Sequence, residues 1–361
     1  PSTARSLAPT TRLAQSNARM RRSKAFGVVP DVYIVHFKNS ATEAQILNVV
    51  RKYELRVVGK IPALGIIYVK RTVPATAPVK DNKSTSRSFG ERAGEKSKPG
   101  AGQAESVLGG LLGRTVARRD VVLSGRAGLG WRGEVLTHDT SSAALLAQLD
   151  DSLERLGTDH LDLWVLHGFS PGVPRDEALS ALDAAVRSGR TRYVGLAIES
   201  GWQLGWTMAH QRGWPDRAVP VAVQAEYSLL RRDIEQQVGP AATELGAGLL
   251  AVSPLGRGVL TGKYRGGVPA DSRAASPHLG PFVAPYLDDW AQSIVEAVAT
   301  AADGLAISPL EVALAWVRDR PSVASAVVGA RTAAQLRGVL LADQVTLPTE
   351  IVEALDEVSA P

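Results

Sequence analysis

Residues 151–168 read DSLERLGTDHLDLWVLHG, a stretch that passes from a helix into a strand and decides the fold class. Its first half completes an amphipathic pattern that predicts a helix over 141–156. LDLWVL at 161–166 then predicts a short, mostly apolar strand, as expected of a strand covered on both faces. A strand of this kind after a helix is typical of a β-α unit.

The same alternation continues on both sides of this stretch. Further strands are expected at 121–124, 193–197, 221–225, 248–252 and 324–328, and further helices at 176–188, 232–245, 288–303 and 308–318. Short apolar strands separated by helices predict an α/β fold with a parallel sheet. An open doubly wound sheet and a closed barrel both fit this pattern. No GxGxxG motif follows the first strand, which argues against the open dinucleotide-binding sheet.

Composition excludes several functional classes. The 361 residues contain no cysteine, which excludes disulfides, a thiol nucleophile and Cys-ligated metal. This fits a reducing compartment, and we expect a cytoplasmic protein. No apolar run is long enough to span a membrane. The six histidines show no metal-ligand spacing with acidic residues, so no metal site is expected.

The net charge of +5 is unevenly distributed. Residues 1–100 contain 19 Lys and Arg against 6 Asp and Glu, whereas 101–361 contain 22 against 30. We interpret 1–30 as a basic flexible arm that could meet an unidentified protein partner. Without interleaved aromatic residues, nucleic acid is not the expected partner. The Arg- and Ser-rich composition of the arm is also that of an organelle transit peptide, which is the alternative localisation.

Three further segments follow the arm. Residues 31–71 predict a small β-α-β-β unit, with strands at 31–37, 55–61 and 66–70 and a helix at 41–54. Residues 72–104 are rich in Pro, Gly, Ser and Lys, which predicts a linker. The composition changes near 105, and 105–361 is expected to be the main domain.

Five motifs in the main domain carry a resemblance. They are ESVLGGLLG (105–113), DSLERLGTDHLDLWVLHG (151–168), QAEYSLL (224–230), SPLGRGVLTGKY (253–264) and VVGARTAAQL (327–336). In this order they resemble the aldo-keto reductases, over residues 105 to about 359. The resemblance implies a (β/α)8 TIM barrel that binds NADP(H), with its chemistry at the carboxyl ends of the strands. Here the barrel would be incomplete or remodelled at its N-terminus.

The resemblance also implies a catalytic set that this chain keeps only in part. The family reaction uses a tyrosine as general acid, a lysine that lowers the pKa of the tyrosine, an aspartate and a histidine. His167 matches the histidine, and Arg126 stands at the lysine position. The aspartate and the tyrosine should precede ESVLGG, where this chain reads AGEKSKPGAGQA. The proton donor is therefore missing from that segment.

The nicotinamide site implied by the family is also altered. Ala197-Ile198 replaces a Ser-Asn pair that would hold the carboxamide, whereas Gln224 matches the family glutamine. Val252 stands where an aromatic side chain would stack on the ring. An aliphatic side chain offers no flat face, so we expect weak contacts to the ring.

The phosphate end of the cofactor site matches the family better. Ser253, Leu255, Gly256 and Arg257 match the loop over the pyrophosphate. Gly329, Arg331, Thr332 and Gln335 match the segment that grips the 2′-phosphate, before a helix whose N-terminus suits anions. NADP(H) is therefore the expected cofactor, bound mainly by its phosphates.

The front of the chain allows two interpretations. The strands at 31–37 and 55–61 could fill the first two barrel positions. Alternatively, 33–70 resembles the prodomain of subtilisin-type proteases, which would explain the third strand.

Three functions follow from these interpretations. The first is a catalytically degenerate aldo-keto reductase-like protein, a pseudoenzyme acting as a scaffold or partner subunit with residual NADP(H) binding. The second is an active NADP(H)-dependent carbonyl oxidoreductase whose acid is Tyr33, Tyr53 or Tyr68. The third is an interaction protein with a prodomain-like module.

Overall fold

The computed structural model describes residues 33–36, 55–61, 66–71, 102–114, 117–132, 135–276, 279–330 and 333–361. The basic arm 1–30, the helix expected at 41–54 and nearly all of the linker 72–104 lie outside the described residues.

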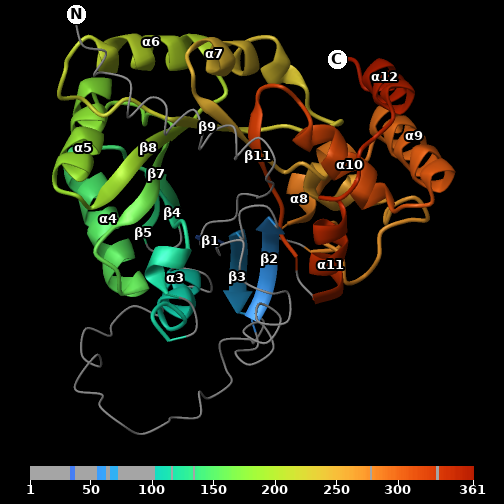
Figure 1. Ribbon diagram of the computed structural model, residues 1–361, viewed down its shortest axis with the longest axis horizontal. Coiled ribbons are helices and arrows are strands. Elements are labelled where there is room, and N and C mark those ends of the chain that lie inside the picture. Colours follow the sequence, from blue (N-terminus) through green and yellow to red (C-terminus); the bar gives the residue numbers. More distant parts are fainter. Residues whose placement is uncertain are drawn as a thin grey trace, which may run out of the picture.

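Six parallel strands form the centre of the molecule (Figure 1). In spatial order they are β4 (Ser124–Ala127), β7 (Leu161–His167), β8 (Thr191–Ala197), β9 (Ala222–Glu226), β10 (Gly248–Val252) and β11 (Val323–Val327). Five of the six strands expected from the sequence are confirmed, whereas the one expected at 121–124 lies further along the chain and shares only Ser124 with β4. There the Asp162 carboxylate accepts a hydrogen bond from the backbone N–H of Leu123 at 2.8 Å, so a side chain satisfies a donor that would otherwise join the ladder.

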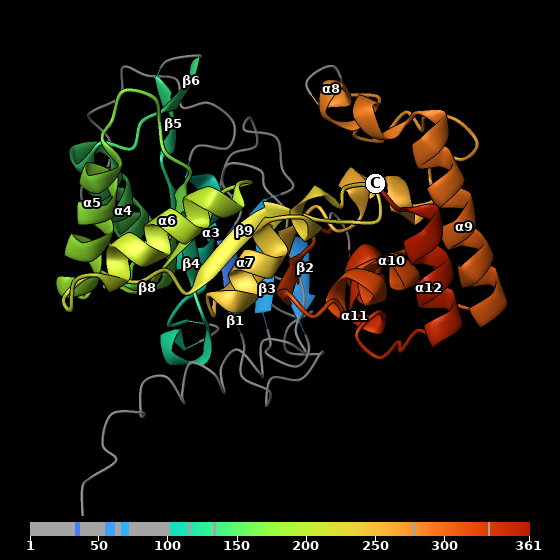
Figure 2. The same cartoon turned by 90° about the horizontal axis from the view of Figure 1, so that it is seen from above.

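Helices cover the outer face of this sheet on two sides (Figure 2). One group is α4 (Ser142–Leu156), α5 (Arg175–Arg187), α6 (Gly201–Arg212) and α7 (Val238–Glu244). The other is α9 (Asp289–Leu305), α10 (Pro309–Arg318), α11 (Ala333–Leu341) and α12 (Thr349–Val358). The helix expected over 232–245 is divided into the turn η2 (Asp233–Glu235) and α7, because Gly239-Pro240 allows a helix to begin there but not to continue through.

Two layers of apolar side chains alternate along each strand. Outward-facing residues such as Trp164, Leu196 and Val223 pack under the helices. Residues of the opposite face such as Leu163, Val165 and Val252 belong to a second, smaller cluster, which also includes side chains of α10 and α11. This alternation fixes which strand residues face the interior.

Shorter elements lie between the strands and helices. They are α3 (Gln103–Gly109), η1 (Arg118–Asp120), the hairpin of β5 (Leu129–Arg132) and β6 (Val135–His138), η3 (Gly256–Thr261), α8 (Gly280–Val283) and η4 (Ala284–Tyr286). The hairpin and α8 project at the same end of the molecule (Figure 2). That end is where the parallel strands finish, because the hairpin follows β4 and α8 follows β10.

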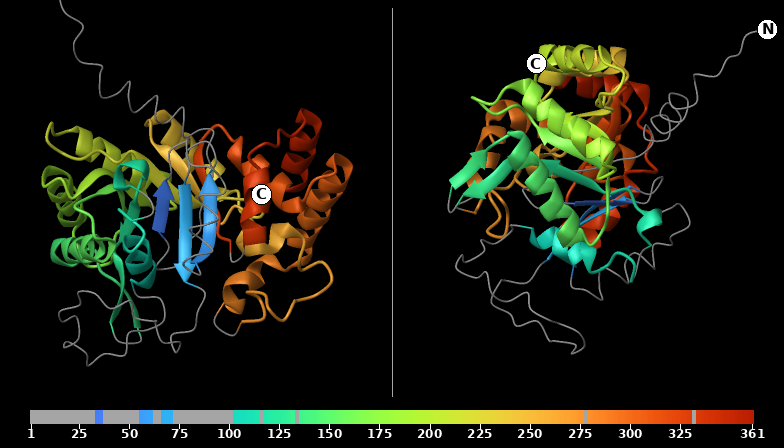
Figure 3. Two further views of the ribbon diagram at one scale, coloured as in Figure 1. Left: turned by 60° about the horizontal axis from the view of Figure 1, so that its bottom comes forward. Right: turned by 90° about the vertical axis from the view of Figure 1, so that its left-hand side faces the viewer.

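Three N-terminal strands extend the sheet beyond β4. They are β1 (Tyr33–His36), β3 (Ile66–Arg71) and β2 (Leu55–Ile61), in this spatial order. Ile34 pairs with Ser124 of β4 in the antiparallel direction, and β3 is antiparallel to both of its neighbours. In Figure 3 these blue strands lie between α3 and α11. Three antiparallel strands thus stand where the barrel interpretation expected two, because the short connection 62–65 makes β2 and β3 adjacent and antiparallel.

Among the described residues, no single helix has the length and apolar composition needed to cross a membrane. The pair α9 and α10 passes this test only when counted together, and it is bent by 101°.

Candidate active site

His167, Ala197 and Gln224 lie side by side on the inner face of the sheet. Backbone pairing joins His167 to Ala197 and Ala197 to Gln224, so the three residues form a row across β7, β8 and β9. All three strands are near their carboxyl ends at this row. The sequence-predicted histidine and glutamine are therefore brought together at the end of the sheet where parallel α/β folds place their chemistry.

The histidine of this row is held through its backbone. His138 of β6 lies with its Nε2 2.7 Å from the carbonyl oxygen of His167, and the two rings meet edge to face at 5.7 Å. Burial lowers the pKa of His138, and the Asp139 carboxylate partly offsets this effect. The Nδ1 atom of His167 is buried without a hydrogen-bond partner. None of the described protein groups therefore satisfies this ring nitrogen.

Arg126 of β4 occupies the position at which the resemblance calls for a lysine. Its Nε atom is buried without a hydrogen-bond partner, and burial lowers the pKa of the guanidinium to about 10. At neutral pH the side chain remains a cation. None of the described acidic residues forms an ion pair with it.

The two residues of the Ala197-Ile198 pair point in different directions. Ala197 packs against the inner cluster, whereas the Ile198 side chain is buried in the outer cluster under the helices. The backbone N–H of Ile198 donates to the carbonyl of Gln224 at 3.2 Å. Only Ala197 therefore faces the row. Oε1 of Gln224 is buried without a hydrogen-bond partner, as expected of a group that awaits a donor such as a carboxamide.

Val252 lies on the inner face of β10, the strand next to that of Gln224. It lies at the end of β10, in register with Glu226, and belongs to the inner apolar cluster. The loop that follows is strained, because Ser253 and Arg257 adopt left-handed backbone angles with φ of 52° and 56°. Gly256 has φ of 51°, and a Cβ there would lie 2.6 Å from the Leu230 side chain. The expected phosphate loop, including Leu255, is thus an unusual backbone shape of the kind that occurs at functional sites.

Arg257 contacts protein groups rather than open solvent. Its guanidinium donates to both carboxylate oxygens of Glu226 at 2.8 and 3.2 Å, and also to the carbonyl of Phe282 in α8. The Tyr286 hydroxyl donates to the same carboxylate at 2.9 Å. Sequence reasoning missed Glu226 and Tyr286. The signal available was the acidic residue inside QAEYSLL, two positions after Gln224 and therefore on the same inner face.

The segment expected at the 2′-phosphate is described only in part. Gly329 is exposed after β11, and Gln335 is exposed on α11. Arg331 and Thr332 lie outside the described residues, so their predicted contacts remain predictions.

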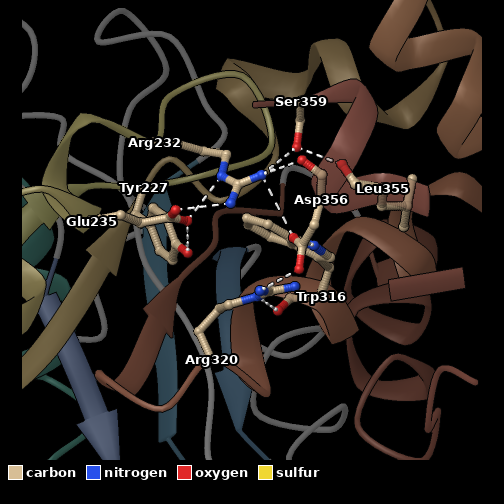
Figure 4. A network of polar contacts seen from close by, with 8 residues as sticks. All are labelled: Tyr227, Arg232, Glu235, Trp316, Arg320, Leu355, Asp356 and Ser359. Atoms are coloured by element: carbon tan, nitrogen blue, oxygen red, sulfur yellow. Dashed lines mark hydrogen bonds and ion pairs between the residues drawn. The ribbon is translucent and has the colours of Figure 1, made fainter. Parts of the chain in front are cut away.

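None of the described tyrosine side chains lies where a proton donor is needed. Tyr227 donates to Glu235, and Figure 4 shows it in a network with Arg232, Trp316 and Asp356. Burial, helped by Glu235, raises the pKa of Tyr227 far above its usual range, and burial with Glu226 does the same for Tyr286. A raised pKa makes a phenol a weaker acid, so neither Tyr227 nor Tyr286 is suited to donate a proton. Tyr193 is exposed at the other end of β8, and the Tyr264 hydroxyl lies 3.4 Å from the backbone N–H of Ala274.

The alternative acids are less well defined. Tyr33 and Tyr68 lie on β1 and β3, where only the backbone is described, and Tyr53 lies outside the described residues. Across the described ranges, no group of three or more His, Asp or Glu side chains is arranged to hold a metal ion.

A sequence model of the Aldo/keto reductase family matches residues 85–360. The chain belongs to the aldo/keto reductase family. This aldo/keto reductase is 34% identical over 212 residues to the uncharacterized oxidoreductase YrpG of Bacillus subtilis, covering 58% of this chain and 62% of that protein. It is 30% identical over 267 residues to the L-glyceraldehyde 3-phosphate reductase of Escherichia coli, covering 72% and 76%. It is 31% identical over 265 residues to a probable voltage-gated potassium channel subunit beta of Oryza sativa, covering 72% and 79%.

Family membership confirms the fold expected from the motifs, a (β/α)8 barrel whose members typically bind NADP(H). The family match begins at residue 85, within the stretch expected to be a linker.

Proposed function

We propose that this aldo/keto reductase binds NADP(H) chiefly through the phosphates and does not reduce carbonyls at ordinary enzymatic rates. It would act as a pseudoenzyme, in the role of a scaffold or partner subunit. One observation carries the proposal: burial, together with bonds to carboxylates, raises the pKa of Tyr227 and Tyr286, the described tyrosines nearest the strand ends. A general acid in this family needs a phenol whose pKa is lowered.

The residue at the lysine position supports the same proposal. Arg126 keeps the positive charge, but its planar guanidinium cannot replace a compact ammonium beside a phenol without changing the geometry. The segment AGEKSKPGAGQA, in which the resemblance places the tyrosine, contains no residue with a phenol. General acid catalysis is worth about 10²–10⁴-fold, so its loss leaves only trace turnover.

The role of partner subunit has its own support. The name of the rice relative, a channel subunit beta, describes a protein that assembles with another. In this chain the excess of basic residues over 1–100 is the candidate surface for an acidic protein partner.

An active carbonyl oxidoreductase is the second candidate. His167 and Gln224 keep the side chains that the family places at the substrate and the nicotinamide, and both have an unpartnered buried polar atom. In this case the acid would come from residues outside the described ranges or from Tyr33 or Tyr68.

A turnover assay separates these two functions. Purified full chain is mixed with NADPH and a panel of aldehydes and ketones, and NADPH oxidation is followed by absorbance. We expect no turnover above the rate of His167→Ala. Arg126→Lys restores the ammonium of the family but not its phenol, so we expect this variant to remain inactive as well. Steady turnover of the unmodified chain that His167→Ala abolishes would overturn the proposal.

A further inference from the structure

The segment between η3 and α9 is apolar on both of its faces. Residues 279–287 read LGPFVAPYL, and Tyr286 carries the one polar side-chain group in this run. Val283 and Tyr286 are buried against the barrel, and the Tyr286 hydroxyl donates to Glu226. A helical segment at a protein surface normally turns polar side chains to the water, and this run has none to turn outward.

Four large apolar side chains are exposed on the outer face of this segment. The exposed fractions are 41% for Leu279, 60% for Phe282, 37% for Leu287 and 46% for Trp290. These four side chains, with the exposed Pro281, Ala284 and Pro285, are called the α8 patch. The patch covers α8, η4 and the first turn of α9, and α8 stands at the rim of the molecule (Figure 2). Exposed apolar side chains gathered in this way mark a binding surface.

Hydrogen bonds hold the backbone under the α8 patch in place. The Arg257 guanidinium donates to the carbonyl oxygen of Phe282, and the Tyr286 hydroxyl lies 2.9 Å from Oε1 of Glu226. Arg257 and Glu226 are themselves paired at 2.8 Å. The patch is thus carried by an anchored element. A surface that is already ordered loses less conformational entropy when a partner binds to it.

The charges around the α8 patch favour a partner of no net charge. Residues 261–290 contain three basic and three acidic residues, whereas 1–100 has an excess of 13 basic residues. Such a balance attracts neither a strongly charged protein nor an anionic membrane. Lys263 follows η3, which contacts α8 and α9, and Asp289 begins α9; both are exposed. In a twofold contact a surface meets its own copy, so opposite charges on one surface can pair across the axis.

The size of the α8 patch also fits a second copy of the chain. At the exposed fractions given above, its four large side chains present roughly 400 Å² of apolar surface to water. A standard interface buries about 800 Å² on each partner, of which about 60% is apolar. The four side chains with the two prolines and the alanine therefore supply nearly the whole apolar part of such an interface, and the surrounding charges supply its polar rim.

We propose that two copies of this chain associate through the α8 patch, with α8 and the first turn of α9 of one copy packed on the same elements of the other about a twofold axis. Phe282 and Trp290 would supply most of the binding free energy, because large aromatic side chains dominate interfaces of this size. The association goes beyond the proposed function, since it requires neither bound nucleotide nor absence of turnover, and its surface is separate from the basic residues 1–100.

Sedimentation velocity of the full chain between about 1 and 200 µM tests the association. We expect a monomer–dimer equilibrium with a dissociation constant of about 1–100 µM. Phe282→Ser and Trp290→Ser should each weaken the dimer at least tenfold. The matched control is Trp214→Ser, which removes a tryptophan that is 61% exposed in the turn after α6 and should leave the dimer unchanged. All four proteins should have the same melting temperature at low concentration, because each change is made at an exposed side chain.

Salt distinguishes this contact from one made by the basic residues 1–100. Raising sodium chloride from about 0.1 M to about 1 M should leave an apolar dimer as tight or make it tighter, whereas it should weaken an association driven by charge.

The absence of cysteine from the chain allows a direct test of the surface. Ala284→Cys places a single thiol on the α8 patch, and Ala209→Cys places one on α6, at an alanine that is also exposed. With a short bismaleimide, we expect crosslinked dimers of Ala284→Cys but not of Ala209→Cys, and their loss when Phe282→Ser is added. A chain that stays monomeric at 200 µM, a dimer that both serine variants keep, or a monomer that instead binds phosphatidylcholine vesicles through Phe282 would overturn the proposal.

Discussion

The guanidinium of Arg257 and the carboxylate of Glu226 form a two-pronged ion pair, with Nη2 to Oε2 at 2.8 Å and Nε to Oε1 at 3.2 Å. The pair joins the loop after β10 to the carboxyl end of β9, and the contact of Arg257 with Phe282 adds α8. Both side chains are largely buried, with 26% and 15% of their surfaces exposed. Screening by water is therefore limited, and the pair should stabilise the fold.

Replacement of Arg257 by Met should lower the free energy of unfolding by about 1–3 kcal/mol, because the Glu226 carboxylate would lose its cation while remaining buried. Urea unfolding measures this change. The matched control is Arg265→Met, which removes an ion pair with Glu296 whose side chains are 45% and 47% exposed. That variant should lose clearly less stability, because water screens an exposed ion pair. Equal losses in the two variants would contradict the structural role assigned to Arg257.

Nucleotide affinity should depend mainly on the phosphates. We expect 2′,5′-ADP to bind nearly as tightly as NADPH, because Ala197 and Val252 offer the nicotinamide neither a hydrogen bond nor a flat surface. Fluorescence titration compares the two ligands. Ala197→Ser adds a hydroxyl in the row beside Gln224 and should improve NADPH binding by about threefold to tenfold without changing that of 2′,5′-ADP. NADPH binding about 100-fold tighter than that of 2′,5′-ADP in the unmodified chain would mean that the ring site works.

Gln224 should strengthen NADPH binding without stabilising the nucleotide-free protein. Its Oε1 is buried without a partner, so Gln224→Leu removes an unsatisfied acceptor while nearly keeping the side-chain volume. We expect the nucleotide-free variant to be as stable as the unmodified chain or about 1 kcal/mol more stable, and to bind NADPH more weakly. Thermal unfolding with and without NADPH measures both effects. A destabilised variant with unchanged NADPH binding would show that Gln224 is structural.

Much of this fold could be predicted from the sequence, because each parallel strand is a short apolar run bounded by helical periodicity. LDLWVL and GLLAV predict β7 and β10 in this way. The hairpin β5–β6 was missed, since Gly130 and charged residues interrupt its pattern. At the site, His167 and Gln224 followed from motifs. The pairing of Arg257 with Glu226 could not be predicted from the sequence. Glu226 ends β9 and Arg257 lies in the loop after β10, so only the folded sheet brings them together.

Tyr227 should make stability fall in alkaline solution. Burial and Glu235 raise the pKa of its phenol in the folded state, so the phenol ionises first in the unfolded chain. The stability that it contributes is complete below about pH 10, the ordinary pKa of tyrosine, and is lost as the pH rises above that value. Tyr227→Phe should cost about 1–2 kcal/mol at pH 7 through the lost bond to Glu235, and this deficit should shrink above pH 10.

The measurement for Tyr227 is urea unfolding of both proteins between pH 7 and 11. Tyr193→Phe, at an exposed side chain of β8, controls for the loss of a phenol hydroxyl and should change stability by less than about 0.5 kcal/mol at pH 7. A deficit of Tyr227→Phe that grew above pH 10 would contradict the direction of the pKa shift.

Asp356 should hold the C-terminal helix α12 against the barrel. Its carboxylate accepts hydrogen bonds from the Trp316 indole and from Arg320, both at 2.9 Å, and lies 3.6 Å from Arg232 (Figure 4). In Asp356→Asn the amide oxygen can keep the indole bond, but the side chain can no longer neutralise two guanidinium groups. We expect the free energy of unfolding to fall by about 1–3 kcal/mol. Urea unfolding measures this change, with tryptophan fluorescence as the signal. The neighbouring Glu357 is exposed on the same helix, so Glu357→Gln should lose less than about 0.5 kcal/mol. The ion pairs at Asp356 would be shown to contribute nothing if both variants unfolded at the same urea concentration.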